Sequence, residues 1–192
     1  MKKRIAIFAS GSGSNAQKIM EHFKRNAEAE VVLILTNNPQ AYVLQRADNF
    51  EIPSHVFTRQ EFYETDDVIR MLKTLQVDLI VLAGFLWLVP PSLLKSFPNK
   101  IINLHPALLP KYGGKGMYGD NVHKAILAAN EEESGITIHF VNEEFDEGEI
   151  IHQSKFKIEP GDNLEMVKFK GQQLEHQHFP KVIESLLKKM KG

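Results

Sequence analysis

The run INLHPALLP, residues 102–110, carries two polar side chains in an otherwise apolar stretch, Asn103 and His105. Side chains two positions apart share one face of a strand, so both point the same way if the run ends a strand. Pro106 biases the backbone of His105 toward an extended conformation and so fixes the direction of its imidazole. The Asn103 amide and a protonated His105 can both donate hydrogen bonds, which indicates an oxyanion-stabilising pair for acyl-type chemistry. A buried histidine with a purely structural role is the alternative.

A histidine in this role needs a raised pKa, which a nearby carboxylate would supply. The acidic segment NEEFDEGEI, residues 142–150, is predicted to form a turn between two late strands. Asp146 is a candidate because it lies in this turn close to Gly148. Four glutamates compete with it, namely Glu143, Glu144, Glu147 and Glu149. Spacing alone does not choose among these carboxylates.

A second candidate site is the segment ASGSGSNAQ, residues 9–17, between an expected strand and an expected helix. Its glycines allow a sharp turn, and the free amides of a helix start can bind a phosphate. Gly11, Gly13 and Ala16 also meet the spacing of a dinucleotide fingerprint. However, the next strand ends in Thr-Asn-Asn (residues 36–38) instead of the acid that would hold a ribose. The pattern therefore favours a single phosphate over NAD, with a tight turn that binds nothing as the alternative.

The remaining histidines indicate no metal site. His176 and His178 are two apart on an expected helix and therefore point to different sides. His139 and His152 lie in expected strands and are predicted to be structural. The role of His123, near the start of another expected helix, stays open.

The elements that would position these residues alternate between strands and helices in the first half of the chain. Strands are expected at residues 4–10, 31–37, 55–58, 78–85 and 100–105, and helices at 15–27, 42–50, 62–76 and 92–97. Apolar runs without polar alternation indicate strands that are covered on both faces. The pattern predicts a doubly wound, mostly parallel α/β sheet of Rossmann-like type.

The second half predicts an addition to this sheet. Strands at 135–142 and 149–158, close together in the chain, are expected to pair antiparallel at a sheet edge. A long C-terminal helix is predicted to start at Asp162, with Glu165 completing a capping box. Pro180 is expected to bend or break this helix.

Length and composition limit the class of protein. The chain has 192 residues, 43% of them hydrophobic, which predicts a single domain over residues 1–192. Basic and acidic residues nearly balance (23 and 24) without a basic run, so no nucleic-acid partner is expected. The absence of cysteine excludes disulfides and thiolate chemistry. No apolar segment reaches membrane-spanning length, so a cytoplasmic protein without a membrane partner is expected.

Four segments together resemble those of phosphoribosylglycinamide formyltransferases, in the same order: GSGSN (11–15), AGFLWLVP (83–90), INLHPALLP (102–110) and GITIHFVNEEFDEGEII (135–151). The resemblance spans the whole chain. It implies the Rossmann-like formyltransferase fold, with a nucleotide- and phosphate-binding half at 1–100 and a catalytic and folate-binding half at 101–192. It also implies a monomer or a homodimer.

The activity that this resemblance implies is transfer of the formyl group of 10-formyltetrahydrofolate to the amine of glycinamide ribonucleotide, in purine biosynthesis. The implied route is direct attack through a tetrahedral intermediate, without a metal or a covalent enzyme intermediate. The family's catalytic Asn, His and Asp fall on Asn103, His105 and Asp146, so the resemblance, and not spacing, selects Asp146. Asn103 and protonated His105 would stabilise the oxyanion, and Asp146 would keep the imidazole charged.

Ligand-binding residues are also implied by the resemblance. For glycinamide ribonucleotide they are Gly13, Ser14 and Asn15 at the phosphate and Glu175 at the ribose. For the folate they are Arg59, Leu86, Trp87, Leu88, Val89, Asn103, Asn142 and Asp146. The chain departs from the family pattern at three places: Trp87 replaces a common arginine, Ala107 replaces a common serine, and loop 113–121 is longer than in some members.

Other functions remain as alternatives. Another enzyme that uses 10-formyltetrahydrofolate shares the motifs, but methionyl-tRNA formyltransferase and formyltetrahydrofolate hydrolase would each be expected to carry a further domain. A Rossmann-type nucleotide-binding module without transfer activity is the alternative from a different class.

Overall fold

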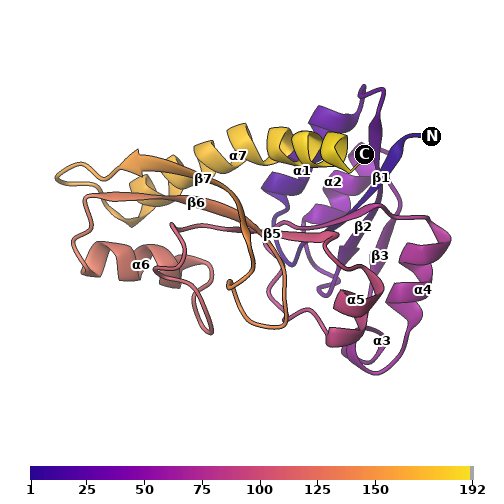
Figure 1. The fold of residues 1–192 in the computed structure, drawn as a ribbon. Coiled ribbons are helices and arrows are strands. Elements are labelled where there is room, and N and C mark those ends of the chain that lie inside the picture. The colour runs from indigo at the N-terminus through magenta and orange to yellow at the C-terminus, as the bar shows by residue number, and fades with distance from the viewer. Residues whose placement is uncertain (191–192) are drawn as a thin grey trace.

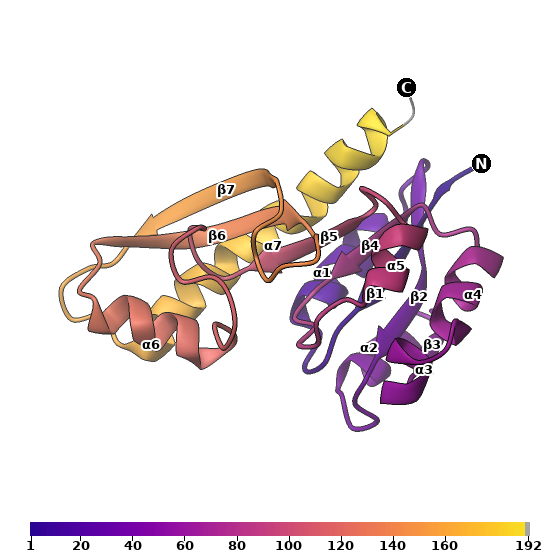
Figure 2. The ribbon, with the colours of Figure 1, turned by 60° about the horizontal axis from the view of Figure 1, so that its bottom comes forward.

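The computed structural model describes residues 1–190 and is built on one seven-stranded sheet with helices on both faces (Figures 1 and 2). The predicted domain includes residues 191 and 192, which lie outside the described part. The strands are β1 (Lys3–Phe8), β2 (Ala29–Thr36), β3 (Ser54–Val56), β4 (Leu79–Leu82), β5 (Ile101–His105), β6 (Glu133–Phe140) and β7 (Ile150–Lys157). The helices are α1 (Ser14–Phe23), α2 (Val43–Asn49), α3 (Arg59–Tyr63), α4 (Asp67–Thr74), α5 (Pro91–Ser96), α6 (Asp120–Ala128) and α7 (Leu164–Lys189).

The sheet order is β3-β2-β1-β4-β5-β6-β7. The strands from β3 to β5 run parallel, and β6 and β7 are added antiparallel at one edge. The predicted fold class, a doubly wound and mostly parallel sheet with an antiparallel addition and a long C-terminal helix, is therefore confirmed. In such a sheet the order reverses between β1 and β4, and ligands bind at the carboxyl ends of the strands on either side of that point.

Two apolar layers explain why the strands appear in the sequence as unbroken hydrophobic runs. Ile5 and Ile7 of β1 pack with α1, α2 and α7 on one face. Ala6 and Phe8 of the same strand pack with α3, α4 and α5 on the other. Because successive side chains of a strand point to opposite faces, every position of β1 from Ile5 onward is buried.

The helix predicted at residues 62–76 is wrong, because two helices, α3 and α4, occupy this region. The hydroxyl of Thr65 donates to the carboxylate of Asp67 and to the backbone oxygen of Glu61 at the break. Short polar side chains of this kind compete with helical hydrogen bonding. The start of α3 is fixed by a capping box between Thr58 and Glu61 that sequence reasoning missed.

The expectations for the ends and continuity of α7 also need correction. Its N-cap is Asn163, whose side chain accepts from the amide of Met166, so there is no capping box at Asp162. Asp162 instead accepts from the amide of Glu159 and from the ammonium of Lys170. The helix is not broken at Pro180, which is buried in its interior. Packing of the buried face of α7 against the sheet outweighs the loss of one backbone hydrogen bond.

Within residues 1–190, no helix combines the length and the apolar character needed to cross a membrane.

Candidate active site

A cavity of about 720 Å³ lies where the first turn of α1 meets the loops after β4 and β5. Its wall also includes residues from the β6–β7 turn, from α6 and from one face of α7. The carboxyl ends of parallel strands meet at one edge of the sheet, which explains why segments far apart in sequence share this cavity. All three predicted catalytic residues, Asn103, His105 and Asp146, lie in its wall.

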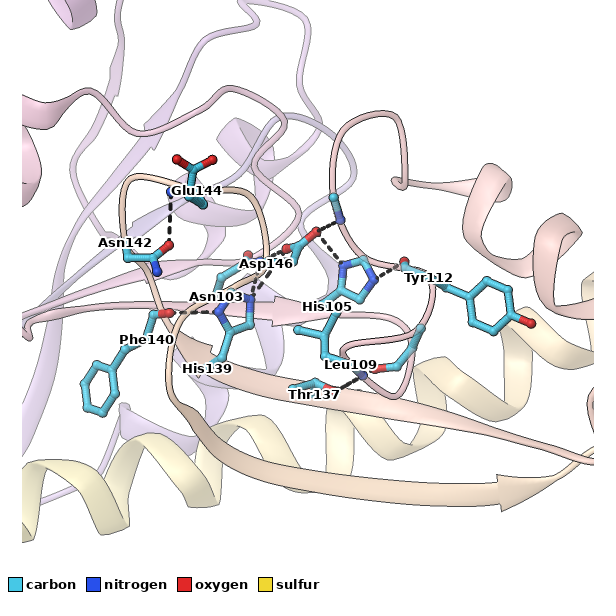
Figure 3. Close-up of polar contacts among 12 residues, drawn as sticks. Asn103, His105, Leu109, Tyr112, Thr137, His139, Phe140, Asn142, Glu144 and Asp146 are labelled. Carbon is cyan, nitrogen blue, oxygen red and sulfur yellow. Dashed lines mark hydrogen bonds and ion pairs between the residues drawn. The ribbon is translucent and has the colours of Figure 1, made fainter.

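Figure 3 shows how Asn103, His105 and Asp146 are held together. Asn103 and His105 end β5, and Asp146 reaches them from the β6–β7 turn, where its φ is 58°. One oxygen of Asp146, Oδ2, lies 3.4 Å from Nδ1 of His105. Its other oxygen, Oδ1, accepts from the Asn103 amide at 3.5 Å. The carboxylate therefore lies between the two side chains that the strand presents.

Loop 113–121 and Tyr112, the residue before it, contact this group directly. The backbone amide of Gly114 donates to Oδ2 of Asp146 at 3.0 Å. The carbonyl of Tyr112 lies 2.7 Å from Nε2 of His105. Since a carbonyl oxygen can only accept, Nε2 carries a proton in this arrangement. A substrate group that approaches Nε2 must therefore displace the Tyr112 carbonyl.

The electrostatics of His105 differ from the expectation. Burial lowers the pKa of His105 below its ordinary value, although Asp146 and the Tyr112 carbonyl act in the opposite direction. Asp146 thus acts in the predicted direction, but the expected net rise of the pKa is not found, because burial outweighs the carboxylate and the sequence does not report how strongly the ring is desolvated. His105 is 3% exposed. With Nε2 protonated and the ring neutral, the lone pair of Nδ1 faces Asp146, so a proton gained at Nδ1 would at once form an ion pair.

Asp146 stays ionised. Burial alone would raise the pKa of Asp146, but contacts with His139, His105 and the Gly114 amide together lower it. A carboxylate with several donors around it favours its charged form even in a desolvated place. The site thus places an imidazole whose pKa burial lowers beside a carboxylate whose pKa its neighbours lower.

His139 is a member of this site that sequence reasoning treated as structural. Its Nδ1 donates to the Phe140 carbonyl at 2.8 Å, which leaves Nε2 as an acceptor in the neutral ring. That nitrogen lies 3.2 Å from the Asn103 amide and 3.6 Å from Oδ1 of Asp146. His139 is directly opposite Asn103 in the β5–β6 register. The contact between His139 and Asn103 could be predicted only once the antiparallel pairing of β5 and β6 was known.

Residues 9–17, the glycine loop, pack closely through their backbone. Gly13, the N-cap of α1, has a φ of 71°, and a Cβ there would lie 2.4 Å from Cγ2 of Val43. Val43 donates its amide to the carbonyl of Gly11, and Arg46 donates Nε to that of Ser12 at 2.7 Å. Arg46 is thus a cation beside the loop that sequence reasoning missed.

Glu175, predicted at a nucleotide ribose, is brought next to this loop by α7. Its Oε2 accepts from the amide of Asn15 at 2.6 Å, and one turn earlier Gln172 donates to the hydroxyl of Ser14 at 3.3 Å. Burial raises the pKa of Glu175. Oδ1 of Asn15 is buried without a hydrogen-bond partner. Asn15 and Glu175 line the cavity, whereas Gly13 and Ser14 do not.

The predicted folate residues divide into two groups. Leu86, Trp87, Leu88 and Val89, which follow β4, all line the cavity. Arg59 and Asn142 lie outside its wall. The guanidinium of Arg59 stacks 5.7 Å from the ring of Trp87 and 4.9 Å from that of Tyr63. The side chain of Asn142 accepts from the amide of Glu144.

Among residues 1–190, no group of three or more His, Asp or Glu side chains could hold a metal ion. His178 lies in a stacked pair with His152, with ring centroids 4.9 Å apart.

The lowered pKa values of His105 and His123 predict how stability depends on pH. In the unfolded chain both rings titrate near 6.5, so below that pH the unfolded chain binds more protons than the folded one. The free energy of unfolding should therefore be highest above about pH 7 and should fall as the pH drops toward 5.5. Urea denaturation at pH 7.5 and 5.5 measures this change. Equal stability at both pH values in the wild type would contradict this prediction. The His105→Gln/His123→Phe variant should lose less free energy of unfolding between pH 7.5 and 5.5 than the wild type.

Comparisons with known proteins agree with one another over most of the chain. Residues 3–183 match the family model described as formyl transferase. The chain is 40% identical over 187 residues to the phosphoribosylglycinamide formyltransferase of Haemophilus influenzae, covering 95% of this chain and 86% of that protein. It is 37% identical over 190 residues to that of Bacillus subtilis, covering 96% of this chain and 95% of that protein. It spans 65% of a chloroplastic relative from Arabidopsis thaliana.

Solved structures give the same result. A crystal structure of phosphoribosylglycinamide formyltransferase from Bacillus halodurans superposes with a TM-score of 0.87 at 38% identity. That alignment covers 98% of this chain and 97% of the other.

Proposed function

Because the chain belongs to the formyl transferase family, we propose that it transfers the formyl group of 10-formyltetrahydrofolate to the amine of glycinamide ribonucleotide, a step of purine biosynthesis. The observation that carries this proposal is the meeting of Asn103, His105 and Asp146 in the wall of one cavity. Hydrogen-bond donors and a group that can carry a proton, held close together, suit a reaction that passes through a tetrahedral oxyanion.

In the proposed reaction the amine attacks the formyl carbon and the carbonyl electrons move to oxygen. The Asn103 amide donates to that oxyanion. The collapse of the intermediate then breaks the bond to N10 of the folate. One proton leaves the amine and one reaches N10, so a single imidazole that accepts the first and donates the second balances the transfer.

His105 is the proposed proton carrier. Its lowered pKa supports this role, because a neutral ring can accept the proton of the attacking amine. The proton gained at Nδ1 faces Asp146 at 3.4 Å, and the nearby oxyanion further favours the charged ring. Asp146 is proposed to stabilise the imidazolium that forms during the reaction, and not to keep it charged beforehand. None of these steps requires a metal.

The two substrates are proposed to bind on different sides of the cavity, with glycinamide ribonucleotide at the start of α1 and the facing part of α7. Gly13, Ser14 and Asn15 at the start of α1 would bind the phosphate, and Glu175 would bind the ribose. The buried, unpartnered Oδ1 of Asn15 supports a ligand there, since buried polar atoms are nearly always paired. Residues 1–100 thus supply the phosphate site, and residues 101–192 the catalytic residues.

The folate is proposed to lie against Leu86, Trp87, Leu88 and Val89, with Asn103, Asn142 and Asp146 on its other side. The largely apolar wall after β4 supports this position, because a pterin buries a flat apolar surface. Arg59, stacked on Trp87, is proposed to meet the acidic tail of the folate at the rim. Trp87 itself would contribute a ring face instead of a charge.

The test is the absorbance of a 10-formylfolate analogue mixed with the protein, with and without glycinamide ribonucleotide. Deformylation is expected only when the ribonucleotide is present. Loss of the formyl group without it would identify a hydrolase, and no loss in either mixture would contradict formyl transfer altogether. His152→Phe, at a histidine outside the cavity wall, should behave as the wild type.

A further inference from the structure

His123, in the first turns of α6, is a buried histidine that the proposed reaction does not use. Its side chain lines the same cavity as His105, and the residue is 8% exposed. Within residues 1–190 neither ring nitrogen makes a hydrogen bond or an ion pair, and Nδ1 is fully occluded. An unsatisfied buried polar group costs about 1–3 kcal/mol, so a native structure that keeps one needs a reason.

Charged neighbours do not supply that reason. Lys168 on α7, Asp120 on α6 and His105 on β5 are the titratable groups that act on this ring. Burial lowers the pKa of His123, and Lys168 and His105 lower it further against the opposing effect of Asp120. Lys168 is itself paired with Asp120 at 2.9 Å. The lowered pKa favours the neutral imidazole, which offers one hydrogen-bond donor and one acceptor.

Packing places this ring on a particular side of the cavity. Cε1 of His123 lies 3.8 Å from the position that a Cβ on Gly171 would occupy, so the ring rests on α7. Gln172 and Glu175, on the same stretch of α7, hold Ser14 and Asn15 of the glycine loop. Figures 1 and 2 show α6 on the side of the molecule away from α5. The ring thus lies on the α7 side of the cavity, and the helix that carries it lies away from α5, the helix that follows residues 86–89.

We infer that His123 is a further substrate-binding residue, which hydrogen-bonds an amide or hydroxyl group of the acceptor between its phosphate and its reacting amine. This inference rests on the proposed function. A neutral imidazole complements an amide or a sugar hydroxyl, which both donate and accept, better than it complements a phosphate. The donor folate, proposed to lie against residues 86–89, would not contact it.

Calorimetric titration of glycinamide ribonucleotide and, separately, of a non-reactive folate analogue tests this inference. His123→Phe keeps an aromatic ring without nitrogens, and it should weaken acceptor binding at least about tenfold, roughly 1.4 kcal/mol. Folate binding should stay as in the wild type, and the urea midpoint should not fall below that of the wild type. The control is His152→Phe, because Nε2 of His152 is also occluded and unpartnered but lies outside the cavity wall.

Two outcomes would overturn the inference while leaving the proposed function intact: unchanged acceptor affinity in His123→Phe, or equal weakening of both ligands. A wild type that binds no acceptor would instead contradict the proposed function, and the inference with it. A second measurement needs no variant. The ring nitrogen signals of His123 in the wild type should shift when glycinamide ribonucleotide saturates the protein, and unshifted signals would also overturn the inference.

Discussion

Replacing His105 with alanine is expected to lower kcat by about 10³-fold while KM for both substrates changes little. The variant lacks the group that accepts the amine proton and returns it to N10. His139 also lies near Asp146, with Nε2 3.6 Å from Oδ1, but that nitrogen is held by the Asn103 amide at 3.2 Å and is not expected to replace His105. Because this function operates only as charge develops, the loss should appear in kcat and not in ground-state binding. Steady-state rates at saturating substrate, followed by the absorbance of the released folate, measure it.

The control for this prediction addresses folding. His105 is 3% exposed, so its removal leaves a small void beneath the Tyr112 carbonyl. His105→Gln fills most of that volume and can still donate a hydrogen bond, but it cannot carry a proton. It should be as inactive as His105→Ala and close to the wild type in urea denaturation. A kcat within tenfold of the wild type in either variant would contradict the role of His105.

Much of the fold follows from local patterns in the chain. The parallel strands are buried on both faces, so runs such as that of β1 are apolar throughout and were recognisable without any alignment. The errors lie where local side-chain hydrogen bonds or tertiary packing override the preference that the residue pattern indicates. Thr65 ends a helix through side-chain hydrogen bonds, and α7 continues through Pro180 because its buried face packs on the sheet.

Only the part of the candidate site that depends on residue spacing within one strand could be predicted from the sequence. Asn103 and His105 share a face because they are two apart on β5, and this much follows from strand geometry. The contact with Asp146 depends on the β6–β7 turn, and the contact with His139 on the register across β5 and β6. These long-range pairings have no local signal. The lowered pKa of His105 was missed for the same reason, since burial is a property of the assembled structure.

Asp146→Asn is expected to lower kcat by about 10²- to 10³-fold with little loss of stability. Asparagine can still accept from the Gly114 amide, so the turn should keep its shape. It carries no charge to stabilise the imidazolium at His105. Because Asp146 raises the pKa of His105 in the wild type, the variant should have an even lower value there.

The pH dependence of kcat/KM separates this charge effect from a general disturbance. The acid side of the profile reports protonation of free His105, which must be neutral to accept the amine proton. In Asp146→Asn this side should move to lower pH, because the neutral ring then persists into more acid solution. A merely misplaced turn would lower the whole profile without moving it. An unmoved acid side, or a kcat within threefold of the wild type, would mean that Asp146 orients the site but does not stabilise charge in it.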